Sequence, residues 1–154
     1  MLVAYVVTKP VGTPSASQLR TYLQACLPGY MIPSRTVFLK KLPVTAGGKP
    51  DRNALPLPEP IRPNLETPYE PPGSPMEAAI AQIWSDLLGL DPIGVHDDFA
   101  DLGGDSLMAA QVAVRVGERF GVEITSAALF DQPTIAKLAV CLSGPCPATS
   151  NWTG

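Results

Sequence analysis

Cysteine, histidine and long apolar runs are scarce in this chain of 154 residues, and each scarcity excludes a class of protein. The three cysteines form no C-x-x-C pair, so the sequence predicts neither a zinc site nor a framework of disulfide bonds. No apolar run approaches the length of a membrane helix and nothing resembles an export signal, so we expect no membrane partner and a cytoplasmic location. The single histidine, His96, provides no evident base for activating a nucleophile, and no glycine-rich phosphate loop is present.

Charge is distributed unevenly, although the formal net charge is only −3. Residues 1–73 contain eight Lys and Arg against four Asp and Glu, whereas residues 74–154 contain three against ten. An acidic second part repels the phosphates of nucleic acids, so we expect no nucleic acid partner and favour a basic protein partner. The two parts are therefore expected to be different units.

Proline marks the boundary between these units. Seven prolines fall between Pro56 and Pro72, a density that forbids a helix and disfavours a central strand. We interpret residues 56–73 as a linker, which as polyproline II would rise about 3.1 Å per residue and act as a semi-rigid spacer. Residues 143–154 lack any periodicity and are expected to be a disordered tail.

The segment before the linker, residues 1–55, predicts a small α+β unit. The run LVAYVV is typical of a buried strand, SASQLRTYLQACL holds one apolar helical stripe that ends at Pro28, and RTVFLKKL is a second strand. Two short strands and one helix are too few for an independent core. We therefore expect this unit to be a part of a larger one, cut near its strand at residue 2.

The segment after the linker, residues 74–142, predicts helices only. Ser74 is expected as the N-cap of a helix with Pro75 in its first turn, Glu77 completing a capping box and Gly89 ending it. Further helices are expected from about Ser106 to Arg119, around SAALF, and after Thr134. The sequence thus indicates a mainly α fold with four helices packed around one core.

The stretch DDFADLGGDSL places Ser106 at the start of the second of these helices. Gly103 and Gly104 allow close backbone approach, and Asp105 can cap the helix. The unpaired N–H groups and the helix dipole there favour a phosphate by about 0.3 to 1 kcal/mol. From these residues alone, a loop closing onto a helix is the favoured interpretation, and a phosphate-bearing site needs further context in the sequence.

The same stretch resembles the phosphopantetheine attachment motif of carrier domains, D-x-F-x-x-L-G-G-[HD]-S-L. The resemblance implies a four-helix, ACP-like bundle in which a separate, magnesium-dependent phosphopantetheinyl transferase esterifies Ser106 with 4'-phosphopantetheine from coenzyme A. Ser106 would then be a modification site flanked by Gly104 and Asp105, and Leu107 and Met108 would contact partner domains.

The segments LPGYMIP and TAGGKPDRNALP resemble the closing motifs of nonribosomal peptide synthetase adenylation domains. This resemblance implies that residues 1–55 are part of an adenylation small subdomain, that Lys49 is its catalytic lysine, and that Leu55, Pro56 and Pro58 form the linker latch. Since the large adenylation subdomain is absent, we expect Lys49 to be idle and the fragment not to be an enzyme by itself. Its partners would be adenylation, condensation and other synthetase domains, and the fragment would be monomeric.

Three alternatives remain open on sequence grounds. The helical unit could be an acyl carrier of a fatty-acid or polyketide pathway, or a helical module used only for interactions. It could also be a small serine hydrolase that uses Ser106, His96 and an aspartate. The apolar residues around most of the helix after Ser106 predict either an exposed docking surface or burial under the SAALF segment.

Overall fold

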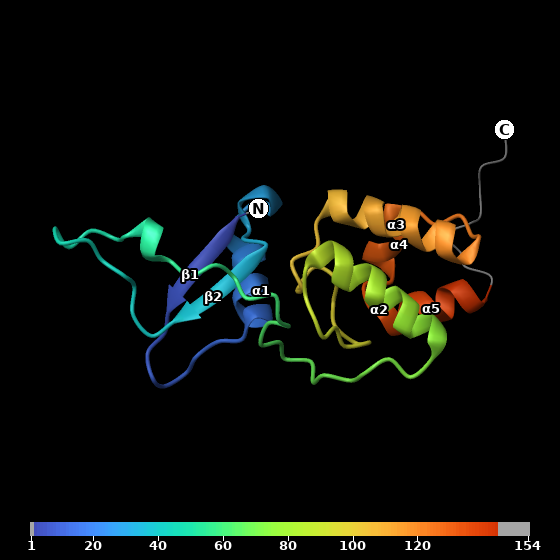
Figure 1. The fold of residues 1–154 in the computed structure, drawn as a ribbon, viewed down its shortest axis with the longest axis horizontal. Helices are drawn as coiled ribbons and strands as arrows, with labels where there is room; N and C mark the ends of the chain where they lie inside the picture. Colours follow the sequence, from blue (N-terminus) through green and yellow to red (C-terminus); the bar gives the residue numbers. More distant parts are fainter. Residues whose placement is uncertain (1, 145–154) are drawn as a thin grey trace.

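The chain forms two units side by side, joined by an extended segment (Figure 1). The structure, a computed structural model, describes residues 2–144. The first unit contains β1 (Val3–Val7), α1 (Ala16–Cys26) and β2 (Arg35–Leu39), with short 3-10 turns at Gly29–Met31 and Arg52–Ala54. The second unit contains α2 (Pro75–Leu88), α3 (Ser106–Phe120), α4 (Ser126–Asp131) and α5 (Ile135–Ser143). The predicted order of strand, helix and strand followed by four helices is confirmed.

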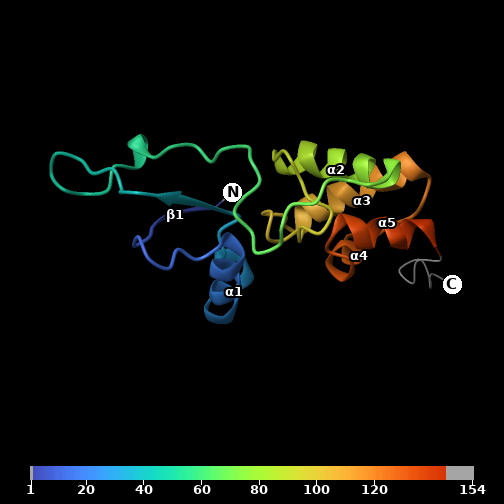
Figure 2. The ribbon, with the colours of Figure 1, turned by 90° about the horizontal axis from the view of Figure 1, so that it is seen from below.

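The first unit is a two-stranded parallel sheet with one helix against it (Figures 1 and 2). The register runs from Val3 opposite Arg35 to Val7 opposite Leu39. Helix α1 begins at Ser15 because the Ser15 hydroxyl accepts from the Gln18 N–H while the Gln18 side chain accepts from the Ser15 N–H. Every fully buried hydrophobic residue within 2–144 lies between Leu65 and Ala139, so this unit has no core of its own.

The first helix of the second unit begins and ends as its sequence predicts. The Ser74 hydroxyl accepts from the Glu77 N–H at 3.2 Å, Pro75 occupies the first turn, and Gly89 ends α2 with φ 64°. The predicted capping box is not formed, because the Glu77 carboxylate accepts from the Gly73 N–H, at 2.8 Å, and not from the Ser74 N–H. The glutamate reaches one residue beyond the cap, and so ties the end of the linker to the helix.

The core of the second unit is built from all four helices and the long loop before α3. Helix α2 packs against α3 and α5, and α3 packs against α4. Trp84 of α2 meets Phe99 of the loop edge to face, with ring centroids 5.0 Å apart. Burying each such side chain stabilises the fold by about 1.5 to 3 kcal/mol. The loop contributes further buried residues to this core: Leu90, Ile93, Val95 and Leu102.

The proline-rich segment contains no helix or strand, as its composition predicts, but it contacts both units along its length. At its start, the Pro56 carbonyl accepts from the Tyr5 hydroxyl at 2.7 Å. In its second part, Leu65 is buried in the core and the Glu70 carbonyl accepts from the Val95 N–H at 3.0 Å. These contacts hold the segment against both units.

Arg62 of the linker and Asp97 of the loop form a buried ion pair. Arg62 Nε donates to Asp97 Oδ2 at 2.7 Å and Nη2 donates to Oδ1 at 2.6 Å, while Asp97 Oδ2 also accepts from the Gly94 N–H at 2.8 Å. Asp97 is 0% exposed, so both of its oxygens are satisfied by protein groups alone. The hydrogen bond to Asp97 raises the pKa of Arg62 above its ordinary value.

The two units also touch directly, at the corner before β2. The Arg35 guanidinium donates to the carbonyl of Leu88, the last residue of α2, and to the Glu59 carbonyl at 3.3 Å. A cation at the C-terminal end of a helix is favourable because the carbonyl dipoles point toward it. Arg20 Nε of α1 lies 3.9 Å from Asp101 Oδ1 of the second unit. The contact between the units is therefore largely polar.

Cys26 is a free, exposed thiol, whereas Cys141 is disulfide-bonded. The sequence predicted no framework of disulfide bonds, and it gave no signal for this single bond. The predicted tail lies outside the described residues from 145 onward, and Ser143 ends α5. Within 2–144, no helix has the length and apolar character needed to span a membrane.

We predict that Arg62→Ala destabilises the helical unit by about 3 kcal/mol, because the substitution leaves a buried carboxylate with one backbone donor. Chemical denaturation followed by tryptophan fluorescence measures the free energy of unfolding. Arg115→Ala, at an exposed position of α3, is the matched control and is expected to stay within about 0.5 kcal/mol of the parent. Equal stability of the two variants would contradict the importance of the pair.

We predict that Asp101→Asn changes how stability depends on pH. Burial chiefly, and then the nearby Asp98, raise the pKa of Asp101 in the folded chain. The folded state therefore binds the proton more tightly, and the free energy of unfolding falls as pH rises from the ordinary aspartate pKa, about 3.9, toward the raised one. Denaturation over a pH series is expected to show a flatter profile for Asp101→Asn, and an unchanged profile for the control Asp131→Asn. An unaltered slope in Asp101→Asn would contradict this assignment.

Candidate functional site

Ser106 is the first residue of α3, and its side chain is exposed. Within residues 2–144 its hydroxyl makes no hydrogen bond. Asp105 is the N-cap, and its carboxylate accepts from the Met108 N–H at 2.8 Å while its carbonyl accepts from the Ala109 N–H. The Asp105 cap therefore satisfies the N–H groups of Met108 and Ala109 and leaves the Ser106 oxygen exposed to solvent.

The helix start beside Ser106 favours an anion. The N–H groups of Ser106 and Leu107 have no partner among the described residues, as the first donors of a helix have no intrahelical acceptor. A phosphate ester on the Ser106 oxygen would lie beside these donors and the positive end of the α3 dipole. The residues present therefore fit a phosphate on this serine, although the Asp105 carboxylate opposes part of the attraction.

The two glycines before the site are required by close packing. Gly103 has φ 94°, and a Cβ there would lie 2.3 Å from the Ser34 carbonyl oxygen of the first unit. A Cβ on Gly104 would lie 2.3 Å from the Phe99 ring, while the Gly104 N–H donates to the Phe99 carbonyl at 2.9 Å. The loop thus folds over the Phe99 ring, which fixes where α3 starts.

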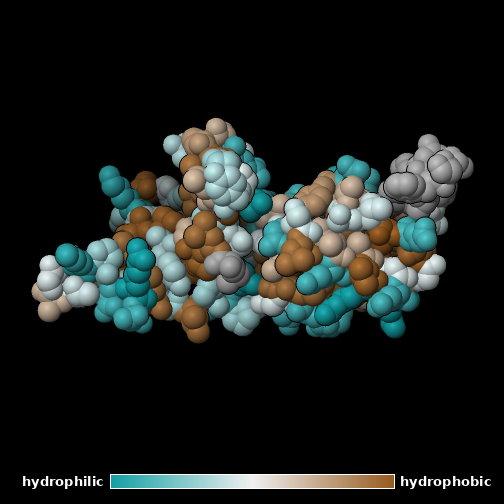
Figure 3. Space-filling view, turned by 90° about the horizontal axis from the view of Figure 1, so that it is seen from above, coloured by the Kyte–Doolittle hydropathy of each residue, from teal (hydrophilic) through white to brown (hydrophobic). Residues whose placement is uncertain are grey.

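Helix α3 has a buried face and an exposed apolar face. Ala109, Val112, Ala113 and Val116 are buried between α2 and α4. Leu107 is 70% exposed and Val114 is 61% exposed, and Met108 is half-buried against the core. Figure 3 shows apolar patches interspersed with polar ones on the face that carries α3. The two sequence alternatives therefore both hold in part, because α4 covers one side of α3 and leaves Leu107 and Val114 uncovered.

His96 does not lie with Ser106 in a catalytic arrangement. Its Nε2 is 3.0 Å from Glu70 Oε2 of the linker, and both side chains are about half exposed. Since Ser106 makes no hydrogen bond to any described residue, no base activates its hydroxyl here. The pairing of His96 with Glu70 does not support the serine hydrolase interpretation. No group of three or more possible metal-ligating side chains occurs within residues 2–144.

The loop of residues 44–50, which contains Lys49, lies at the end of the first unit away from α3, the helix that begins with Ser106 (Figure 1). This loop is closed by a bridge between Val44 and Pro50, and the Lys49 side chain is exposed. Leu55 and Pro58 are half-buried and Pro56 is exposed. The structure thus does not bring the two predicted site regions together.

Sequence reasoning missed a cavity of about 370 Å³ beside β2. Its walls come from β2, the linker, Ala16 of α1, and Asp101 and Leu102 of the loop before α3, which are far apart in the chain. No local pattern predicts such a site, because it exists only where the two units meet.

We predict that Gly104→Ala destabilises the second unit by about 2 to 4 kcal/mol, because the methyl group overlaps the Phe99 ring and displaces the loop. The free energy of unfolding measures the effect. Gly47→Ala is the control, since the nearest atom to its Cβ beyond its chain neighbours would be Thr45 Oγ1, at 3.9 Å. A Gly104→Ala variant as stable as Gly47→Ala would show that the loop moves freely.

Comparisons with known proteins agree on the second unit. Residues 78–142 match the family described as "Phosphopantetheine attachment site". Tyrocidine synthase 3 of Brevibacillus parabrevis is 47% identical over 138 residues, which is 90% of this chain and 2% of that protein. Malpibaldin synthetase of Mortierella alpina is 46% identical over 138 residues, again 90% of this chain and 2% of that protein.

A solved structure is similar over most of the described chain. The crystal structure of a four-domain nonribosomal peptide synthetase in its holo form, bound to AMP and glycine, has 33% identity and a TM-score of 0.50. The match covers 92% of this chain and 10% of that one, so the chain spans a small part of its relatives. Residues 78–142 belong to the phosphopantetheine attachment family, and the helical unit of this chain is a phosphopantetheine carrier domain of the nonribosomal peptide synthetase type.

Proposed function

We propose that Ser106 is the residue that carries the 4'-phosphopantetheine of this domain. The observation that supports this most directly is the exposed Ser106 hydroxyl, free of hydrogen bonds to described residues, at the start of a helix of 15 residues. Gly104 and Asp105 act by fixing and capping that helix start. The bound arm would supply a thiol on which acyl groups are held as thioesters.

The attachment requires a separate enzyme, because nothing beside Ser106 removes its proton. In the proposed step, Ser106 Oγ attacks the phosphorus of coenzyme A that bears the pantetheine arm, and an O–P bond forms. The P–O bond of the pyrophosphate breaks, so the adenosine bisphosphate leaves, and the serine proton passes to a base of the transferase. A magnesium ion held by the transferase would offset part of the negative charge of the pyrophosphate.

We propose that residues 1–55 are the end of an adenylation small subdomain, followed by the linker 56–73 and the carrier domain 74–142. The order and the similarity to synthetases over 138 residues support this division. Lys49 would be the adenylation lysine, idle in this fragment, and Leu55, Pro56 and Pro58 would form the latch. The hydrogen bond from Tyr5 to the Pro56 carbonyl supports a latch that holds the linker on the first unit.

The proposed role is to hold aminoacyl or peptidyl groups and deliver them to partner domains. Leu107, at 70% exposure, and Met108 are beside Ser106 and would contact the transferase and the synthetase domains. An acyl carrier of a fatty-acid or polyketide pathway is the second candidate, but the first unit and the synthetase relatives favour peptide synthesis. We also propose that the protein is located in the cytoplasm and that this fragment is a monomer.

We predict that a broad-specificity phosphopantetheinyl transferase adds one phosphopantetheinyl group from coenzyme A to this chain. Ser106→Ala is expected to abolish the mass gain, because the alanine has no oxygen to form the ester. Ser126→Ala is the matched control, since Ser126 is also the first residue of a helix, and it should be modified like the parent. Intact-protein mass spectrometry measures the product, and tandem spectra assign the residue.

Two results would overturn the assignment. Modification of Ser106→Ala to the same extent as the parent would place the arm on another residue. Failure of a chain that is folded by circular dichroism to gain any mass with the transferase would contradict the carrier role of Ser106.

A further inference from the structure

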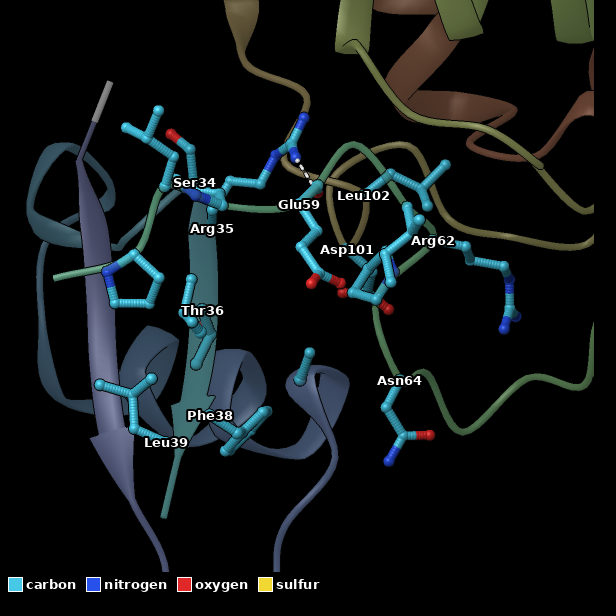
Figure 4. Close-up of a pocket in the computed structure, with 17 residues that line it drawn as sticks. Ser34, Arg35, Thr36, Phe38, Leu39, Glu59, Arg62, Asn64, Asp101 and Leu102 are labelled. Carbon is cyan, nitrogen blue, oxygen red and sulfur yellow. Dashed lines mark hydrogen bonds between the residues drawn. The ribbon is translucent and has the colours of Figure 1, made fainter. Parts of the chain in front are cut away.

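A groove runs along the outer edge of β2, where the two units and the linker meet (Figure 4). Its volume is about 370 Å³, within the range of roughly 300 to 1,000 Å³ typical of ligand sites. All of residues 34–39 line one side of the groove. The other sides are formed by residues 56–59 and 61–64 of the linker, by Ala16, and by Asp101 and Leu102.

The backbone of β2 is unpaired on the side that faces the groove. β1 pairs with the other side of β2, and within 2–144 the main chain of Thr36 to Leu39 makes no further hydrogen bond. The linker cannot pair with it well, because the wall it contributes is interrupted by prolines that have no N–H: Pro56, Pro58 and Pro63. Alternate N–H and C=O groups of β2 therefore remain available to an added strand.

The wall opposite β2 carries two carboxylates, and further acidic groups, Asp98 and Glu66, lie near one of them, Asp101. The carboxylates of Glu59 and Asp101 project into the same space (Figure 4). The nearest cation to Asp101 is Arg20, whose Nε is 3.9 Å away. Two arginines also line the groove: Arg62 is paired with Asp97, and Arg35 donates to the carbonyls of Leu88 and Glu59. A positively charged occupant would therefore complement this wall.

Apolar side chains complete the groove. Val37, Phe38 and Leu39 are half-buried, and Phe38 projects toward the hollow (Figure 4). Side chains of an extended peptide point alternately to opposite faces, so one face can lie on these residues while the other reaches the carboxylates.

We propose that this groove binds an extended basic peptide of a partner protein as a strand added to the free edge of β2, with a Lys or Arg placed beside Glu59 and Asp101. Such strand addition draws affinity from main-chain hydrogen bonds and specificity from alternate side chains. Residues 145–154 contain no Lys or Arg, so this end of the chain does not supply the charge. The proposal does not depend on phosphopantetheine, since Ser106 lies outside the groove.

The test uses the whole chain and two capped synthetic pentapeptides, one alternating Val with Lys and one alternating Val with Glu. Isotope-labelled protein is titrated with each, and amide chemical shifts are followed. The Lys peptide is expected to shift the amides of Thr36 to Leu39 and to bind more weakly as salt concentration rises. The Glu peptide is expected not to bind.

Substitutions of the two carboxylates distinguish their contribution to peptide binding from that of the β2 main chain. Glu59→Gln and Asp101→Asn should each weaken the Lys peptide about twofold to fivefold, while Glu123→Gln, an exposed control in the second unit, should not. No binding up to millimolar peptide, shifts centred on α3, or equal binding of both peptides would overturn the proposal. Concentration-dependent self-association that shifts the same β2 amides would assign the edge to a second copy and also overturn it.

Discussion

The buried pair between Arg62 and Asp97 is the constraint on which the rest of the second unit depends. Asp97 is 0% exposed, so its charge is tolerable only because Arg62 and the Gly94 N–H bind both oxygens. The pair ties the linker to the loop that precedes α3. That loop brings Phe99 beneath Gly104 and against Trp84, and so sets the place where α3 begins.

This arrangement places the exposed Ser106 hydroxyl next to a tightly packed loop. Phe99 and Leu102 are each 1% exposed, whereas Ser106 and Leu107, a few residues on, are exposed. The loop before α3 is held by the core, by the Asp98 carboxylate, which accepts from the Ala100 N–H, and by the Asp105 cap. A modifying enzyme would therefore meet Ser106 at a fixed position while every packed residue stays covered.

Local signals made most of the helical unit predictable from sequence. The caps at Ser74, Asp105 and Thr134 and the glycine end at Gly89 act within one turn, so their residue types alone indicate them. The motif around Ser106 gave the carrier resemblance. By contrast, Arg62 and Asp97 are 35 residues apart, and neither has a neighbour that marks it for pairing. The same limit applies to the groove, whose opposite walls come from distant segments.

The contact between the two units is polar and weak enough to break. Arg35 reaches the end of α2 with its guanidinium partly withdrawn from water, and this burial lowers its pKa. The hydrogen bond it gains there offsets a desolvation cost, so the net stabilisation is small. The fully buried core residues of the helical unit, in contrast, all lie within residues 65–139, outside the first unit. A carrier domain proposed to visit several partners needs a weak polar contact and a strong apolar core. The domain must stay folded each time its contact with the first unit breaks.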